Sequence, residues 1–219
     1  MAVARRSRLL CELYQRLWEV LGGQGWWPGE TPFEVAVGAI LTQNTNWNNV
    51  ARAINRLKEE GALEPQALHE MPETELARLI RPAGYYNIKA KRLKNFLDLL
   101  ATHYRSSMEV MAADSLESLR LALLAVKGIG PETADSILLY ALAKPTFVVD
   151  AYTFRILNRH GLIPETYTYE ELQQFFMDHL PPQVPLYQEY HALLVRLGKD
   201  WCRPQPRCTP CPLNGWPEE

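Results

Sequence analysis

VKGIGPETADSILLYALAKPTFVVDAYTFR, which spans residues 126–155, decides the fold because it contains two helix starts in close succession. Gly128 and Gly130 flank a turn, where glycine allows the backbone to adopt a positive φ and to approach a ligand closely. Pro131 suits the first position of a helix, since its missing N–H would have no partner there. The apolar spacing that follows predicts a helix over residues 133–143. Asp150 then caps a further helix that begins at residue 151.

Both helix starts favour negative charge. Free backbone amides after the glycine turn make a suitable site for a phosphate group. At the second start, the same partial positive charge helps to keep the Asp150 carboxylate ionised. The stretch therefore combines a candidate phosphate-binding turn with a candidate anionic side chain.

This order of elements resembles the helix-hairpin-helix DNA glycosylase superfamily, whose members carry such a hairpin, a loop rich in glycine and proline, and a catalytic aspartate. The resemblance extends over nearly the whole chain. LTQNT at residues 41–45, GYYNIKA at residues 84–90 and a C-terminal group of cysteines follow the order of endonuclease III. A hairpin alone also occurs in non-enzymatic DNA-binding proteins, so it is the four landmarks in order that point to the family.

The resemblance implies an all-α fold with two helical lobes and a catalytic cleft between them. Residues 22–130 would form the central lobe, and residues 1–21 with 131–219 would form the terminal lobe. Periodicity and capping residues agree with an all-α chain, because no alternating strand of useful length occurs. Besides the helices of the hairpin stretch, helices are predicted over residues 5–21, 31–41, 46–60, 65–70, 72–80 and 185–199, in a basic segment capped by Asn87, in a leucine-rich segment capped by Ser115, and after a capping box at Thr168.

Composition is that of an ordinary globular protein, with 219 residues, 47% hydrophobic and 22% charged. The first residues lack a signal-peptide pattern and nowhere do 18 apolar residues occur together, so we expect a cytoplasmic, nucleoid-associated monomer without a membrane partner. A formal net charge of −2 is evidence against a protein that coats DNA, but it allows contacts with a few phosphate groups. The local basic excess comprises Lys89, Lys91, Arg92, Lys94 and Arg105, which a merely solvated helix face would also explain.

Asp150 lies where the resembling family has its catalytic aspartate. Cleavage of an N-glycosidic bond gives the sugar oxocarbenium character, which a carboxylate can stabilise while it activates a water molecule. A plain helix cap is the alternative role. Bifunctional family members carry a lysine where this chain has Glu132, and a carboxylate cannot form the imine needed for strand cleavage. Lys127, across the turn, is expected to contact phosphate. We therefore expect a monofunctional DNA glycosylase of base-excision repair; the alternatives are a bifunctional lyase and a non-catalytic DNA-binding protein.

Further residues are candidates for contact with double-stranded DNA. Gln43 and Asn44 end an apolar helix, where a C-cap is the ordinary role. In the resembling family this glutamine fills the space left by the extruded base, and an amide can both donate to and accept from the orphaned partner base. Tyr85 or Tyr86 could insert between bases, or either ring could pack under its loop.

Three tryptophans, Trp26, Trp27 and Trp47, belong to segments that border the cleft in the resembling family. An electron-rich ring stacks well on a cationic base, and alkylated purines carry such a charge. The pattern is similar to the endonuclease III-like branch that removes 3-methyladenine, so damaged duplex with an alkylated purine is the expected substrate. Packing in the core is the alternative for each tryptophan.

The C-terminal cysteines have the spacing Cys202-x5-Cys208-x2-Cys211. The family often adds a fourth cysteine and holds a [4Fe–4S] cluster with the set. Here the fourth position is Pro217, and the first spacing is one residue shorter than in endonuclease III. Cys11 is a possible substitute ligand, although a cysteine in an apolar helix is usually inert packing. A cluster, a zinc ion with a non-cysteine ligand, and no metal all remain open.

Overall fold

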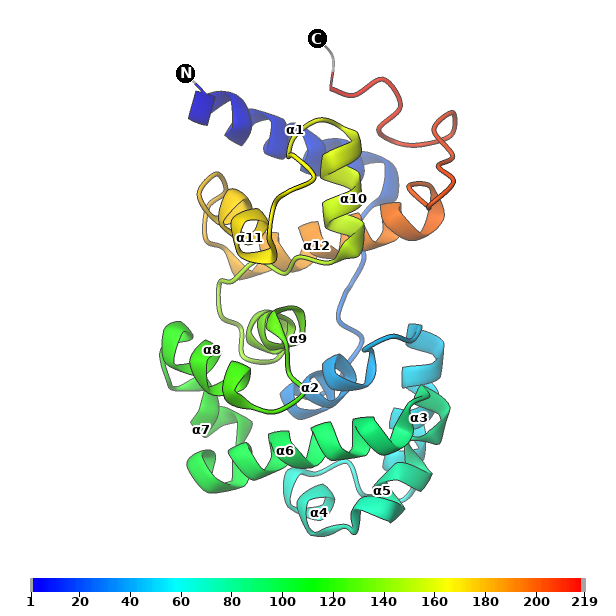
Figure 1. Ribbon diagram of the computed structural model, residues 1–219, viewed down its shortest axis with the longest axis vertical. Coiled ribbons are helices and arrows are strands. Elements are labelled where there is room, and N and C mark those ends of the chain that lie inside the picture. Colours follow the sequence, from blue (N-terminus) through cyan, green and yellow to red (C-terminus); the bar gives the residue numbers. More distant parts are fainter. Residues whose placement is uncertain (1, 218–219) are drawn as a thin grey trace. The chain divides into compact units, whose positions relative to one another are not determined.

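The computed structural model describes residues 2–217, with side chains from residue 4 onward. Every regular element in that part of the chain is helical, as the periodicity predicted (Figure 1). None of the helices described is both long and apolar enough to cross a membrane.

The chain folds into two compact units. Unit 1 comprises Met1–Trp26 and Pro145–Glu219, and unit 2 comprises Trp27–Lys144. The sequence analysis placed the second boundary near residue 130, before the helix that follows the glycine turn. That helix instead belongs to unit 2, where it packs against α2 (Pro32–Leu41).

Unit 2 is built around α2, which is buried along almost its entire length. The sequence Thr31-Pro32-Phe33-Glu34 predicts a capping box at the start of this helix. Thr31 does cap it, because its side-chain oxygen accepts from the N–H of Glu34. The Glu34 carboxylate instead accepts from the N–H of Glu30, so the box is not complete. Around α2 the chain forms α3 (Trp47–Glu59), α4 (Pro65–Glu70), α5 (Glu73–Leu79), η1 (Arg81–Ala83), α6 (Tyr86–Tyr104), α7 (Met108–Ala112), α8 (Leu116–Ala125), α9 (Pro131–Ser136) and η2 (Ile137–Ala141). One continuous apolar core fills the space between these helices.

The helix predicted over residues 133–143 changes type halfway. It is α-helical as α9 and becomes the π-helix η2, in which the N–H of Leu142 donates to Ile137 O at 3.0 Å. Over five residues the apolar spacing does not distinguish the two helix types. The π turn faces α2, so tertiary packing decides the difference.

The start of α6 also differs from the prediction, because Asn87 is not its cap. The preceding residues Gly84 and Tyr85 have φ values of 69° and 46°, and the helix begins directly after them. Lys89 reaches back from the first turn of α6 and donates to Ala83 O at 2.7 Å. This buried amine therefore holds the loop in its left-handed conformation, and burial lowers the pKa of Lys89 to about 8.

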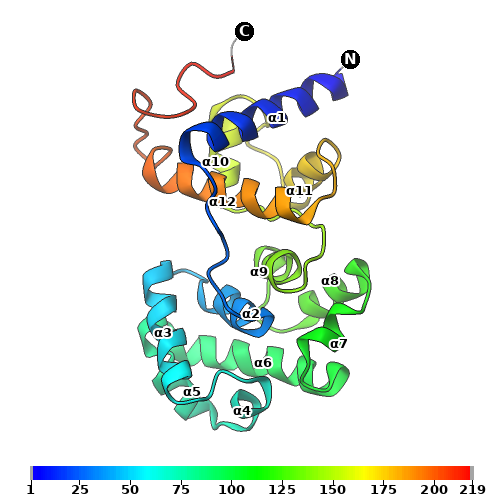
Figure 2. The same cartoon turned by 180° about the vertical axis from the view of Figure 1, so that it is seen from behind.

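Unit 1 contains α1 (Ala2–Leu21), α10 (Ala151–Arg159), α11 (Tyr169–Met177) and α12 (Val184–Asp200). α12 packs against both α1 and α10, as the two ribbon views show (Figures 1 and 2). The Tyr190 hydroxyl donates to Leu10 O at 2.8 Å, which joins the N-terminal helix to the C-terminal segment. The capping box predicted at Thr168 is present, with Glu171 as the reciprocal partner.

Candidate active site and DNA-binding turn

Asp150 is the N-cap of α10, as predicted from the sequence. Its Oδ1 accepts two hydrogen bonds from Thr153, one from the backbone N–H at 2.7 Å and one from the hydroxyl at 2.8 Å. The three residues before it, Phe147, Val148 and Val149, are buried and fix the chain where it enters the helix. Because Thr153 occupies Oδ1, the second carboxylate oxygen is the one left for other partners.

His191 on α12 is that second partner, with Nε2 3.7 Å from Asp150 Oδ2. Only 11% of the Asp150 side chain and 7% of the His191 side chain are exposed. Burial by itself would raise the pKa of Asp150, but the nearby His191 and the hydrogen bonds from Thr153 outweigh it. The pKa of Asp150 therefore lies below its ordinary value, and the carboxylate is an anion at neutral pH.

The contact between α10 and α12 places this pair. Gly198 allows Tyr152 to approach α12 so closely that a Cβ atom there would lie 2.4 Å from Cδ1 of the ring. Arg155 donates from α10 to Gly198 O at 3.2 Å and to Cys202 O at 2.7 Å. Sequence analysis missed His191, because nothing in an apolar helix connects one histidine to an aspartate far away in the chain.

The glycine turn lies in unit 2, between α8 and α9. Gly128 has a φ of 99°, which favours glycine, and the N–H of Ile129 donates back to Val126 O at 3.0 Å. Gly130 is different, since its φ is −96° and a Cβ atom would meet no atom within 4 Å. The expectation of positive φ was therefore right for Gly128 and wrong for Gly130.

Gln43 is not a C-cap, because Thr42 has that position at the end of α2. The Gln43 amide instead donates to Gly128 O at 3.1 Å and to the Thr133 hydroxyl at 2.9 Å. It also accepts a hydrogen bond from Arg92. Asn44, the other predicted contact, is exposed and has a φ of 54°. The loop after α2 is thus joined to the glycine turn by Gln43.

The residues that face solvent at the turn are Lys127, Gly128, Gly130 and Glu132. Glu132 lies in the first turn of α9, where a carboxylate is favoured by the helix dipole. Lys127 and Glu132 are the two side chains that bear on whether the protein is a lyase, and both are exposed.

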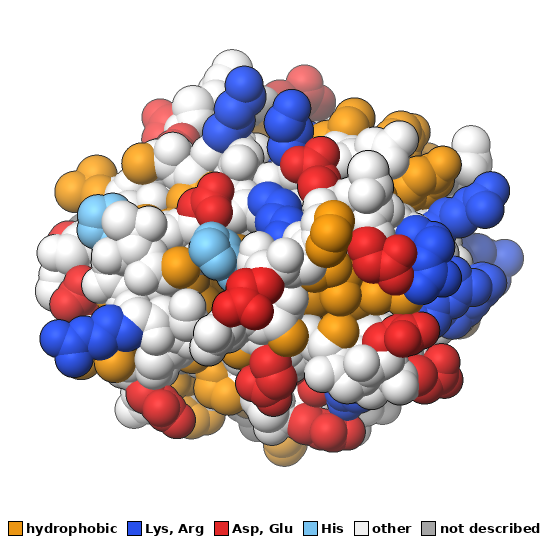
Figure 3. Space-filling model, turned by 90° about the horizontal axis from the view of Figure 1, so that it is seen from below, with side chains coloured by type: hydrophobic (Ala, Val, Ile, Leu, Met, Phe, Trp, Pro, Cys, Tyr) orange, Lys and Arg blue, Asp and Glu red, His pale blue; other side chains and the backbone are white. Residues whose placement is uncertain are grey.

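Only part of the predicted basic run is available for phosphate. Lys89 is buried, and Lys94 donates to three backbone carbonyl groups, those of Leu68 and His69 at 2.7 Å and that of Met71. Lys91 and Arg105 remain exposed. The face shown in Figure 3 mixes acidic and basic side chains instead of presenting one broad basic surface, in keeping with the slightly negative net charge.

Two of the three tryptophans, Trp27 and Trp47, pack together within unit 2. Trp27 and Trp47 meet edge to face in unit 2 with ring centroids 5.3 Å apart, and Tyr140 lies 5.4 Å from Trp27. Gly38 makes room for them, because a Cβ atom would lie 3.0 Å from Trp27 Nε1. Trp26 belongs to unit 1, where Lys199 Nζ lies 5.4 Å from its ring.

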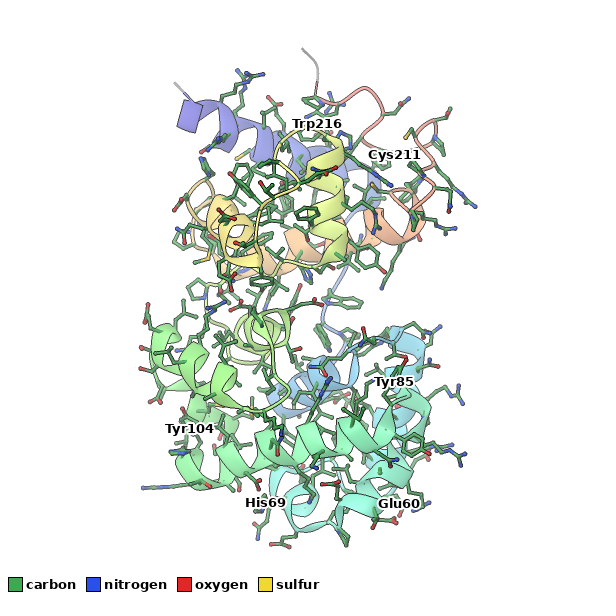
Figure 4. All side chains as sticks on the ribbon, viewed as in Figure 1. Glu60, His69, Tyr85, Tyr104, Cys211 and Trp216 are labelled. Atoms are coloured by element: carbon green, nitrogen blue, oxygen red, sulfur yellow. The ribbon has the colours of Figure 1, made fainter. Side chains whose placement is uncertain are left out.

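Of the two loop tyrosines, Tyr85 is the one that is free to reach a partner. It is 68% exposed, whereas the half-buried Tyr86 packs against the core with Arg81 5.9 Å from its ring. Figure 4 labels Tyr85 next to the first turn of α6. An exposed aromatic side chain on a left-handed residue is an unusual combination, typical of positions kept for binding.

One pocket of about 410 Å³ is lined by Cys202, Cys208 and Cys211 together with His160 and Trp216. Figure 4 labels Cys211 and Trp216 on the C-terminal segment. Burial, together with the neighbouring Cys202 and Cys208, raises the pKa of the Cys211 thiol. Cys11 lines a different pocket on α1 and is not a fourth ligand here. Across residues 2–217 no three Cys, His, Asp or Glu side chains are grouped to hold a metal ion. These residues therefore do not fit a four-thiolate cluster.

Comparison with known proteins agrees with this geometry. Residues 37–182 match the family described as HhH-GPD superfamily base excision DNA repair protein. A protein of Methanocaldococcus jannaschii named "Putative DNA repair glycosylase MJ1434" is 48% identical over 210 residues, covering 95% of this chain and 96% of the relative. Endonuclease III of Thermotoga maritima is 32% identical over 184 residues, covering 84% and 81%. The H. pylori 3-methyladenine DNA glycosylase (MagIII) bound to 1,N6-ethenoadenine superimposes with a TM-score of 0.77 at 30% identity, covering 89% of this chain and 97% of that one.

Proposed function

Because the chain belongs to the HhH-GPD superfamily of base excision DNA repair proteins, we propose that it is a monofunctional DNA glycosylase that removes alkylated, cationic purines from duplex DNA. The observation that carries this proposal is Asp150, a nearly buried carboxylate whose pKa is held below its ordinary value. In the cell we expect it to act as a cytoplasmic monomer on the nucleoid.

Asp150 supplies negative charge to the reaction. As the N-glycosidic bond breaks, the bonding electrons leave with the base and the sugar acquires positive charge at its anomeric carbon. A carboxylate that remains ionised can stabilise this charge and accept a proton from the attacking water molecule. Thr153 holds one of its oxygens, so the carboxylate does not have to reorganise during the reaction.

A cationic purine is an easier leaving group than a neutral one. When the bonding electrons move onto an alkylated ring, they neutralise its positive charge, so departure requires no additional proton. The edge-to-face pair Trp27 and Trp47 offers electron-rich rings for such a base. The similarity to a 3-methyladenine DNA glycosylase supports the same substrate class, because 3-methyladenine in DNA is a cationic base. Trp26 is a weaker candidate for this contact, since Lys199 already lies over its ring.

The absence of lyase chemistry is inferred from Glu132. An imine needs a neutral amine close to the sugar, and a carboxylate at this position cannot provide one. Lys89 has the lowered pKa that suits such an amine, but its side chain is buried and donates to Ala83 O. Lys127 is exposed beside the turn and is the alternative nucleophile to be tested.

The turn at residues 127–130, Gln43 and Tyr85 are proposed to contact the duplex. Gly128 permits a close approach of backbone to a phosphate group, and Tyr85 is exposed enough to insert next to an extruded base. Phosphate contacts position the protein without reading sequence, as repair of scattered lesions requires.

A panel of duplexes, each with a single lesion, tests the proposed function. We expect base loss from the 3-methyladenine duplex, seen as strand breaks only after alkali. Cleavage before alkali would contradict the monofunctional assignment, and thymine glycol removed as fast as 3-methyladenine would contradict the substrate class. A parallel reaction with undamaged duplex is the control.

A further inference from the structure

The turn at residues 127–130 is held from within unit 2 by side chains of two other segments. Asn95 on α6 donates to Lys127 O at 2.8 Å, and Gln43 after α2 donates to Gly128 O at 3.1 Å. In a trans peptide the carbonyl group and the following N–H point in opposite directions. Since Asn95 binds the Lys127 carbonyl, the N–H of Gly128 points to the other side, and Gly128 is exposed.

Gln43 has a defined amide orientation in this arrangement. Its nitrogen donates to Gly128 O and to the Thr133 hydroxyl, and its oxygen accepts from Arg92 Nη1. Arginine has donors and no acceptor, so only the oxygen of the amide can face it. Arg92 therefore determines which way the Gln43 amide is turned.

Arg92 also touches the turn itself. A Cβ atom added at Gly128 would lie 2.5 Å from Arg92 Cγ and 3.0 Å from its Cδ and Nε. The aliphatic part of the side chain thus fills the space above Gly128, while the guanidinium group binds Gln43. One side chain of α6 contacts both of the elements that we assign to DNA.

We propose that Arg92 is a positioning residue that joins the turn at residues 127–130 and Gln43 into one preorganised DNA-binding unit. The inference rests on the proposed function for the use of these elements on DNA. Groups fixed before association lose less conformational entropy when the complex forms, which strengthens binding without a new contact. In this account Arg92 acts through Gln43 and the turn and does not neutralise a phosphate.

The salt dependence of binding separates a positioning role from a phosphate contact. The full-length protein and its Arg92→Met variant are titrated with undamaged duplex over a series of salt concentrations. Methionine keeps an unbranched apolar stem and removes the donors. We expect Kd to rise about tenfold at each salt concentration, with the slope of log Kd against log salt unchanged, because no phosphate contact is lost. A slope reduced by about one would show a direct phosphate contact and would overturn the proposal.

A double-mutant cycle tests the connection to Gln43. The losses of binding free energy in Arg92→Met and Gln43→Met should not add, since each substitution breaks the same unit. The double variant should therefore bind duplex no more weakly than the single variant with the higher Kd. Lys91→Met is the matched control, because Lys91 is an exposed cation next to Arg92 on the same helix. Its loss should add to that of Gln43→Met. Additive losses for Arg92, or equal non-additivity for Lys91, would overturn the inference.

Folding of each variant is checked by circular dichroism and its melting temperature. If Arg92→Met does not fold, Arg92→Gln, which keeps a donor of shorter reach, takes its place in the same cycle. Binding of undamaged duplex involves no excision, so the two proposals can fail separately. A native protein that binds duplex but excises no base contradicts the proposed function alone, and an additive cycle contradicts this inference alone.

Discussion

His191 Nε2 lies 3.7 Å from Asp150 Oδ2. His191 belongs to α12, and Asp150 is the N-cap of α10. Thr153 holds the other carboxylate oxygen, so the two oxygens of Asp150 have different partners. The carboxylate is nearly buried, and burial alone would favour its neutral form. His191 and Thr153 are therefore what keeps a buried acid ionised for the reaction.

Replacement of His191 by leucine should shift the acidic limb of the pH–rate profile to higher pH. The variant removes a group that lowers the pKa of Asp150 and leaves the burial that raises it. The carboxylate then takes up a proton at a higher pH, and excision is lost earlier on acidification. His179→Leu is the control, since His179 lies in the turn after α11 and its Nδ1 contacts Phe175 O, not Asp150. An unchanged acidic limb in His191→Leu would contradict the positioning role.

The same pair predicts how stability depends on pH. The pKa of Asp150 is lower in the folded chain than its ordinary value, so its carboxylate stabilises the native state above a pH of about 4. This contribution is lost as the pH falls through the folded pKa. The native protein should consequently lose more stability on acidification than His191→Leu does. Urea unfolding at neutral pH and at a pH below about 4 measures the difference, and equal losses would count against it.

Alanine substitutions in the glycine turn should have unequal effects. At Gly128 an alanine must adopt a φ of 99° and its Cβ would approach Arg92 Cγ to 2.5 Å. At Gly130 the φ is −96° and a Cβ meets nothing within 4 Å. We expect Gly128→Ala to destabilise the protein by about 1–3 kcal/mol and to weaken duplex binding. Gly130→Ala is the matched control and should change the unfolding free energy little. Similar losses at both glycines would show that the described turn geometry is not what matters.

Borohydride trapping examines the role of Glu132. The native protein should not become covalently attached to lesion DNA in the presence of borohydride, because the carboxylate of Glu132 cannot form an imine. Glu132→Lys, with an amine at an exposed position of α9, should acquire weak trapping. Efficient trapping of the native protein would refute the monofunctional assignment. If that trapping disappeared in Lys127→Met, Lys127 would be identified as the nucleophile.

Local patterns in the sequence sufficed for the helices and for most caps. Thr31, Ser115, Asp150 and Thr168 all cap the helices at which they were expected. Each of these caps depends on residues within one turn of the helix, which is why a reading of the chain finds them. The α-to-π change at Ile137 depends on packing against α2, and the left-handed residue before α6 depends on the buried Lys89 amine. Apolar spacing predicts neither.

The candidate site was predictable to a similar degree. Asp150 and Gly128 follow from the local sequence and from the family resemblance. His191 and Arg92 could not be found in that way, because their importance comes from side-chain contacts between segments far apart in the chain. Lys89 illustrates the opposite error, since a lysine in a basic run was expected to be solvated and is buried against a carbonyl group. Which lysines of a basic run are buried is decided by tertiary packing, so the folded structure is needed to tell them from the exposed ones.

The most direct test of the central claim compares the native protein with Asp150→Asn on a duplex that contains one 3-methyladenine. Asparagine keeps an oxygen that can cap α10 and removes the negative charge. Single-turnover excision should fall by about a thousandfold, equivalent to about 4 kcal/mol of transition-state stabilisation, while Kd for lesion DNA is kept or lowered. Excision by Asp150→Asn within tenfold of the native rate, with intact folding, would contradict the assignment of Asp150 as the catalytic carboxylate.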